Sequence, residues 1–248
     1  MIASDNVAAL PGHRLRRVSE HLYAFEDTCV VYVLVDEEHA LLIESGSGAI
    51  VEVLPELGVQ TVDWVLHTHH HRDGNWGDGR LVEMGASLAV PEREAHLFEQ
   101  VEDYWRHLAV FDNYYLGSDS FSLARSVPVA RRLEDYGLFR WRGYAFRVVP
   151  TPGHTQGSIA LLTEVDGITV AFTGDLIAES GRLWQVHALQ WEYGAGWGDA
   201  GGIQATALSL AEIQDARPDL LLPSHGAMIT DPERTIGQLE ARLGGLYR

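Results

Sequence analysis

The sequence predicts a mixed α/β fold in which two β-sheets pack together and helices cover both outer faces, a four-layer αββα sandwich. Two observations predict it. Each half of the chain contains short runs of β-branched and aromatic residues, and segments with helical periodicity follow them. Sheets and helices each bury one apolar face, so such layers stack around a shared core. The length of 248 residues, with 46% hydrophobic residues, is expected to form a single domain over residues 1–248.

The first half begins with residues 1–17, which we expect to form an N-terminal arm. The runs 21–26, 28–35 and 40–43 predict adjacent antiparallel strands, because β-branched and aromatic side chains dominate them. A Ser-Gly-Ser-Gly stretch at 45–48 ends this pattern, and 49–57 predicts a short helix. Further strands are expected at 62–66 and 87–90, and Pro91 is expected to start a helix that continues through Trp105.

The second half predicts strands at 144–149, 158–163, 168–172 and 220–222. Asp166 and Gly167 form a turn signal that predicts a hairpin. An apolar stripe predicts a helix over 203–215, and Asp231 followed by Pro232 predicts the start of the last helix. Two aromatic-rich stretches, 104–136 and 177–202, fit no regular element, and we interpret them as loops that cover a pocket.

The charge balance restricts the possible partners. The chain has 18 Lys and Arg against 35 Asp and Glu, a formal net charge of −17. Such an acidic protein repels nucleic acids and anionic membranes, so we expect a small-molecule substrate, and the oligomeric state stays open. Cys29 is the single cysteine, which excludes an internal disulfide. Without a secretory leader or an apolar run near the ~18 residues of a membrane span, the sequence predicts a soluble cytoplasmic protein.

A histidine cluster is the most informative segment. The stretch His67-Thr68-His69-His70-His71-Arg72-Asp73-Gly74 directly follows a predicted strand. If it stays extended, the alternating residues His69, His71 and Asp73 can converge on one metal ion. Imidazole and carboxylate ligands suit zinc, and also iron or manganese.

Three more polar residues stand at the ends of predicted strands. His154 lies in the Pro- and Gly-rich turn 150–158, Asp175 follows 172–174, and His225 follows 222–224. Each of these signals is weak alone. Together with the histidine cluster they predict a metal centre.

These motifs, in this order, resemble those of the metallo-β-lactamase superfamily of metallohydrolases, from about His21 to the last helix. The resemblance implies the αββα fold and a dinuclear zinc hydrolase. It further implies that His69, His71 and His154 hold the first metal, that Asp175 bridges both metals, and that Asp73 and His225 hold the second. A metal-bound hydroxide, oriented by Asp73 as the catalytic residue, would then attack the substrate.

One position departs from the family pattern His-x-His-x-Asp-His, because Gly74 stands where the last histidine is usual. The second site is therefore one ligand short. Water could complete it, or His67, His70 or Asp78 could substitute, or only the first site is filled. We predict two zinc ions with weaker binding at the second site, and we expect Gly74→His to strengthen it.

Asp175 makes the chain similar to glyoxalase II and lactonases, which implies hydrolysis of an ester, thioester or lactone. Two alternatives within the fold stay open: a phosphodiesterase, and a mononuclear iron oxygenase similar to persulfide dioxygenase that uses His69, His154 and Asp175. A module without catalytic activity is a third alternative. The aromatic residues near these motifs, and one histidine among them, are candidate substrate contacts: Trp76, Trp184, His187, Trp191 and Tyr193.

Overall fold

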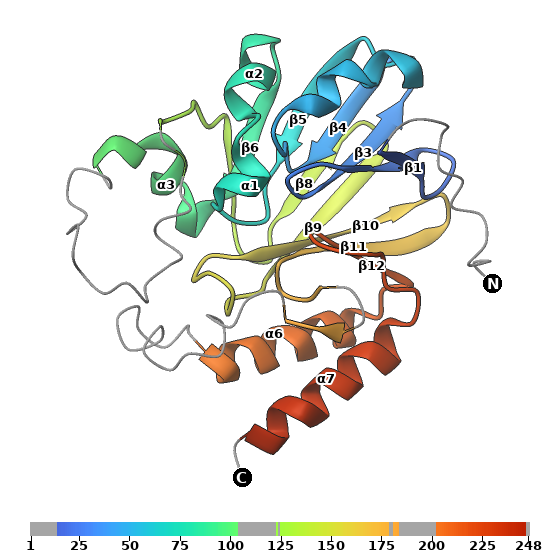
Figure 1. Cartoon of the computed structure of the whole chain (residues 1–248), viewed down its shortest axis with the longest axis vertical. Helices are drawn as coiled ribbons and strands as arrows, with labels where there is room; N and C mark the ends of the chain where they lie inside the picture. The colour runs from blue at the N-terminus through green and yellow to red at the C-terminus, as the bar shows by residue number, and fades with distance from the viewer. Residues whose placement is uncertain (1–13, 104–122, 124, 179–180, 184–201, 247–248) are drawn as a thin grey trace. The chain divides into compact units, whose positions relative to one another are not determined.

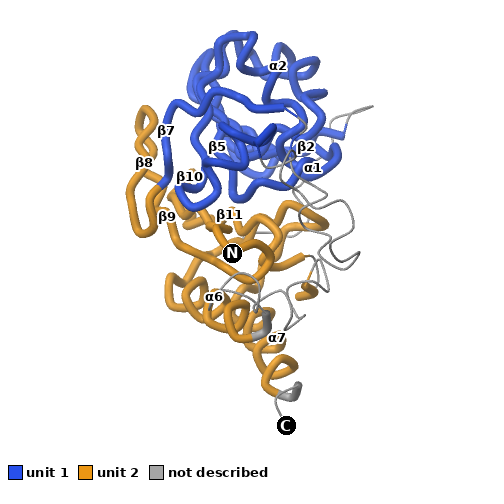
Figure 2. The backbone as a smooth tube through the Cα atoms, turned by 90° about the vertical axis from the view of Figure 1, so that its left-hand side faces the viewer, with its two compact units in different colours: residues 1–133 blue, residues 134–248 orange. Residues whose placement is uncertain are grey.

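The structure is a computed structural model that describes residues 14–103, 123, 125–178, 181–183 and 202–246 (Figure 1). The chain divides into two compact units, residues 1–133 and residues 134–248 (Figure 2). Each unit contains one β-sheet with its own helices. The predicted mixed α/β class with two sheets is thereby confirmed, and the assignment of residues 1–248 to one domain stays a prediction.

Unit 1 is built on a seven-stranded sheet in which the strands follow one another in sequence order. β1 to β4 pair antiparallel, as predicted for the strands of this region, and β4 to β7 pair parallel. Polar residues that directly follow β4 and β5 therefore lie at the same edge of the sheet. The strands are β1 (Leu15–Arg17), β2 (Leu22–Glu26), β3 (Val30–Asp36), β4 (His39–Ile43), β5 (Thr61–Leu66), β6 (Ser87–Pro91) and β7 (Arg131–Leu133).

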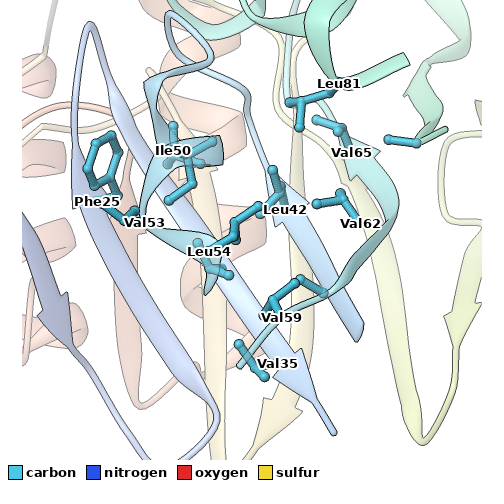
Figure 3. Packing of buried hydrophobic residues seen from close by; sticks show 14 of the residues in the cluster. Phe25, Val35, Leu42, Ile50, Val53, Leu54, Val59, Val62, Val65 and Leu81 are labelled. Atoms are coloured by element: carbon cyan, nitrogen blue, oxygen red, sulfur yellow. The ribbon is translucent and has the colours of Figure 1, made fainter. Parts of the chain in front are cut away.

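Short helical segments connect these strands and complete the core of unit 1. Ile50, Val53 and Leu54 come from the connection between β4 and β5, and they gather with Leu42 of β4 (Figure 3). Leu81 of α2, the second helix after β5, belongs to the same buried cluster. The helical segments are η1 (Ala49–Glu52), η2 (Leu54–Leu57), α1 (Arg72–Asn75), α2 (Asp78–Glu83), η3 (Glu92–Glu94) and α3 (His96–Glu99).

Unit 2 is built on a five-stranded sheet in the order β12-β11-β10-β9-β8. Its strands are β8 (Leu138–Trp141), β9 (Tyr144–Pro150), β10 (Ile159–Val165), β11 (Ile168–Gly174) and β12 (Leu220–Pro223). The predicted hairpin joins β10 and β11, and Asp166 and Gly167 both have positive φ (52° and 78°), as a type I′ turn requires. α6 (Gly202–Ala216) and α7 (Pro232–Leu246) supply apolar side chains to the core of this unit.

The structure corrects several predicted boundaries. Residues 49–57 form two 3₁₀ turns rather than one helix, because Pro55 has no N–H with which to continue the hydrogen bonding. Pro91 ends β6 in extended conformation and pairs with Leu133, so helical structure begins after it rather than at it. η3 and α3 follow, helical structure resumes at 101–103 after a break at Gln100, and Trp105 lies outside the described residues. The last three residues of the predicted arm, 15–17, form β1.

Most of the two aromatic-rich stretches lies outside the described residues, so their predicted role as pocket-covering loops stays a prediction. The described part of the first stretch contains β7. Among the helices that the structure describes, none combines the length and the apolar content that a membrane crossing requires.

Candidate metal centre

The histidine cluster of unit 1 lies at the carboxyl end of β5, which pairs with β4 and β6. The backbone is extended at His71 (φ −66°, ψ 141°), whereas it bends at Thr68 and His69. The rings of His69 and His71 nevertheless lie next to each other. Their rings meet edge to face with centroids 4.8 Å apart, and both side chains are buried. α1 begins at Arg72, and Asp73 therefore lies on a helical turn rather than on the extended loop that the sequence suggested.

Thr68 orients the His69 ring. The Thr68 hydroxyl donates a hydrogen bond to Glu44 Oε1, and its oxygen lies 3.0 Å from His69 Nδ1. Because the hydroxyl proton is directed to the carboxylate, the oxygen accepts from Nδ1–H, and the lone pair of the imidazole is on Nε2. The backbone of His69 is also fixed, since Asn75 Nδ2 donates to its carbonyl oxygen at 3.2 Å.

His67 lies in a buried ion-pair network with two carboxylates. Its Nδ1 lies 2.8 Å from Glu44 Oε2 and its Nε2 lies 2.9 Å from Asp78 Oδ1. Burial by itself lowers the pKa of the imidazole, but the charges of Asp78 and Glu44 and the hydrogen bonds to them outweigh it and raise the pKa of His67 to about 10. His67 and Asp78 are thus engaged with each other, which argues against either as a substitute ligand for a second metal.

His70, the middle histidine of the triplet, has a different partner. Its Nδ1 lies 3.0 Å from Glu94 Oε2, and both side chains are buried. Glu94 belongs to η3, the helical turn after β6. The pair therefore links the histidine cluster to the next strand connection, which is a structural role.

Unit 2 places a carboxylate between two imidazoles. Asp175 directly follows β11, and its Oδ2 lies 3.1 Å from His154 Nε2 while its Oδ1 lies 3.6 Å from His225 Nε2. Asp175 and His154 are buried, and the side chain of His225 is 11% exposed. Ser224 N donates to Gly174 O at 3.0 Å, which holds the ends of β11 and β12 together and brings His225 to Asp175. The three ligands predicted from this half of the sequence thus come together.

The turn that carries His154 is fixed against α6. Ser209 Oγ donates to the carbonyl oxygen of Pro152 at 2.7 Å. Gly153 has φ +145°, and a Cβ added there would lie 2.5 Å from Thr206 Oγ1. Glycine is therefore required for both conformation and space, and the close approach fixes the position of the next residue, His154.

The predicted substrate contacts are mostly untested. Trp76 is 66% exposed at the end of α1, whereas Trp184, His187, Trp191 and Tyr193 lie outside the described residues. The sequence analysis missed Glu44, Thr68 and Glu94. Glu44 carried a usable signal, because it directly follows a buried strand, as the predicted ligands do.

The comparison with protein families decides the assignment. The profile of the metallo-β-lactamase superfamily matches residues 24–225, which span every predicted ligand. The chain belongs to the metallo-β-lactamase superfamily. The family predicted from the motifs, a superfamily of hydrolases, is confirmed.

Two curated proteins illustrate how similar this chain is to known members of the superfamily. A hydroxyacylglutathione hydrolase from Albidiferax ferrireducens is 30% identical over 169 residues, which cover 66% of this chain and 54% of the relative. The β-lactamase-like protein 2 homolog of Drosophila melanogaster is 25% identical over 218 residues, 84% of this chain and 61% of that protein. The chain thus spans between half and two thirds of the length of these relatives.

Solved structures confirm the metallo-β-lactamase fold. A metallo-β-lactamase family protein from Thermus thermophilus has a TM-score of 0.68 at 21% identity, and the match covers 92% of this chain and 81% of that one. A class B3 di-zinc metallo-β-lactamase from an Alaskan soil metagenome has a TM-score of 0.70 at 13% identity and covers 99% and 97%. These similarities concern the fold alone.

Proposed function

We propose that this metallo-β-lactamase superfamily member is a dinuclear zinc hydrolase that cleaves a thioester or a related ester or lactone. The observation that carries the proposal is the buried Asp175 carboxylate, with one oxygen directed to each of two imidazole nitrogens (3.1 and 3.6 Å). A carboxylate in that position can bridge two metal ions. Relatives named hydroxyacylglutathione hydrolase support a thioester as the substrate class.

The donor set fits zinc. His69, His71, His154 and Asp175 are buried side chains able to serve as metal ligands, and Asp73 and His225 are a further carboxylate and a further imidazole of the same donor types. Imidazole nitrogens with carboxylate oxygens are the usual ligands of zinc in hydrolases. In the proposed site His69, His71 and His154 would hold one ion, Asp73 and His225 would hold the other, and Asp175 would contribute to both. When bound, zinc lowers the pKa of a water molecule to about 7 and so supplies a nucleophile at neutral pH.

The side chains of the protein perform the remaining tasks. Asp73 is only partly buried, so its carboxylate can accept a proton from the attacking water and release it to solvent. The Thr68 contact keeps the Nε2 lone pair of His69 available as a ligand atom. The acidic chain disfavours nucleic acid as a substrate. We also propose a small-molecule substrate and a cytoplasmic location.

The test combines metal analysis with substrate turnover. We expect about two zinc ions per chain after purification without chelators, and hydrolysis of S-lactoylglutathione or of aryl ester and lactone probes. Asp175→Asn should lose the second zinc ion and most of the activity, whereas the matched exposed variant Asp215→Asn should retain both. A chain that turns over bis(p-nitrophenyl) phosphate but no acyl substrate would instead be a phosphodiesterase.

Two further results would contradict the proposal. One bound iron with oxygen consumption on a persulfide would assign the oxygenase alternative. A metal-free protein that zinc addition does not activate would remove the enzymatic function altogether.

A further inference from the structure

Glu44 has an unusual backbone conformation for its residue type. It follows β4 with φ +64°, in the left-handed region that non-glycine residues rarely adopt. Such strain persists only where the surroundings fix the conformation, and it gathers at functional sites. The backbone N–H of Glu44 donates to Leu66 O at 2.9 Å, which fixes Glu44 beside the end of β5.

Both carboxylate oxygens of Glu44 accept hydrogen bonds. Oε2 accepts from His67 Nδ1, and Oε1 accepts from the backbone N–H of Thr68 at 3.0 Å and from the Thr68 hydroxyl. The side chain is 1% exposed. Glu44 therefore cannot rotate away without leaving buried donors on both neighbours unsatisfied, which is costly in a protein interior.

Gly74 faces this carboxylate. A Cβ added to Gly74 would lie 2.9 Å from Glu44 Oε2 and 3.4 Å from its Cδ. The φ of Gly74 lies outside the left-handed region, so glycine is not needed there for its conformation. The requirement for glycine at this position is therefore spatial.

The backbone of residue 74 cannot move aside. The carbonyl oxygen of Gly74 accepts from Ser45 N at 2.7 Å, from Gly46 N at 3.0 Å and from Ser45 Oγ at 3.0 Å. Its N–H donates to His71 O at 3.1 Å. Any side chain at 74 must therefore point into the volume of the Glu44 carboxylate.

We propose that Glu44 is a positioning residue that orients His69 through Thr68, and that its carboxylate occupies the space of a side chain at position 74. The Glu44 carboxylate would then require glycine at position 74, and the second metal ion would be held without a ligand from residue 74. The inference concerns a contact within unit 1, and only its consequence for zinc rests on the proposed function. Gly74→His alone is consequently expected to weaken zinc binding, the opposite of what the motif alone suggests.

A double-mutant cycle tests the pairing. Gly74→Ala should lower zinc affinity about 10- to 100-fold, because outer-shell contacts of metal ligands have effects of that size. In a Glu44→Asp background, where the carboxylate is one methylene shorter, the same alanine should lower the affinity less than about threefold relative to its parent. Zinc affinity is measured by competition with a chromophoric chelator. Gly79→Ala is the matched control, because a Cβ there meets nothing within 4 Å.

Thr68→Val tests the orientation of His69 without disturbing the volume at 74. It should lower zinc affinity and change the absorption spectrum of the Co²⁺-substituted protein. Thr163→Val, an isosteric change at another buried threonine, should do neither.

Equal effects of Gly74→Ala in both backgrounds, or unchanged zinc affinity and Co²⁺ spectrum in Thr68→Val, would overturn the inference. If the unmodified chain binds no zinc, the proposed function fails, and the same cycle on the thermal stability of the metal-free protein decides the Glu44–Gly74 contact independently.

Discussion

Gly77 and Gly79 lie at the start of α2. Replacing each of them with alanine should change the free energy of unfolding in opposite directions. A Cβ on Gly77 would lie 2.5 Å from Gly48 N, 2.6 Å from Gly48 Cα and 2.9 Å from Ser45 O, all of them backbone atoms. Gly77 has an ordinary φ of −76°, so the effect of Gly77→Ala is steric. A Cβ on Gly79 meets nothing within 4 Å, and Gly79 lies within α2.

The magnitudes follow from these contacts. Overpacking a rigid site costs about 1–3 kcal/mol. Separating the two backbones also strains the hydrogen bond from Gly77 N to Gly46 O (2.8 Å), which contributes about 1 kcal/mol. We therefore expect Gly77→Ala to lower the free energy of unfolding by roughly 2–4 kcal/mol. Gly79→Ala should raise it by about 0.5–1 kcal/mol, because alanine restricts the unfolded chain and favours the helix.

The assay is urea-induced unfolding of the metal-free chain, with the wild type and both variants measured at one pH. The Gly77→Ala variant should also bind zinc more weakly than the wild type, since the displaced 45–48 turn holds α1 and with it Asp73. Two alanines that change the free energy of unfolding in the same direction, or a Gly77→Ala effect below about 0.5 kcal/mol, would refute the close approach of the two backbones.

Three other perturbations have expected outcomes. The pKa of His67 is raised from 6.5 to about 10, so its stabilising contribution is complete below pH 6.5 and is lost as the pH rises toward 10. Unfolding of the metal-free chain should therefore become easier over that range, and His67→Gln should remove this part of the pH dependence. Asp231→Ala should lower the free energy of unfolding by about 1 kcal/mol, because Asp231 Oδ1 accepts from Arg234 N (3.3 Å) at the start of α7, whereas Asp231→Asn should have little effect. Phe172→Ala should cost about 3–5 kcal/mol in denaturant unfolding, because this side chain on β11 is 1% exposed.

The sequence predicted those elements whose signals are local. The antiparallel strands of unit 1 were recognised from runs of β-branched and aromatic residues, and the hairpin at Asp166 from its turn residues. The wrong boundary at Pro91 has a distant cause, because this residue pairs with Leu133 of β7 and so stays in a strand. Strand pairing between distant segments sets such boundaries, and no local pattern reveals them.

The residues of the candidate site likewise differ in whether a local sequence signal identifies them. The histidines and Asp175 stand in recognisable motifs, and two ion pairs of unit 2 place His154 and His225 beside Asp175. Glu44 was missed because its partners come from another strand. Ile43 at the end of β4 pairs with Leu66 at the end of β5, and this parallel register places Glu44 beside His67 and Thr68.

The same β4–β5 register also explains the glycine at position 74, because it places the Glu44 carboxylate against Gly74. Judged by its motif, Gly74 is a lost ligand, but the structure shows a glycine packed against a buried glutamate that reaches His69 through Thr68. The Glu44 carboxylate also contacts His67, which contacts Asp78 in turn, so a buried carboxylate lies behind the histidine cluster and is connected to His69 through Thr68. A buried negative charge connected to a ligand makes that imidazole more basic and favours a cation nearby. In the proposed site, Glu44 would support His69 from the space that a side chain at residue 74 would otherwise occupy, so the motif has to be interpreted together with the residues packed against it.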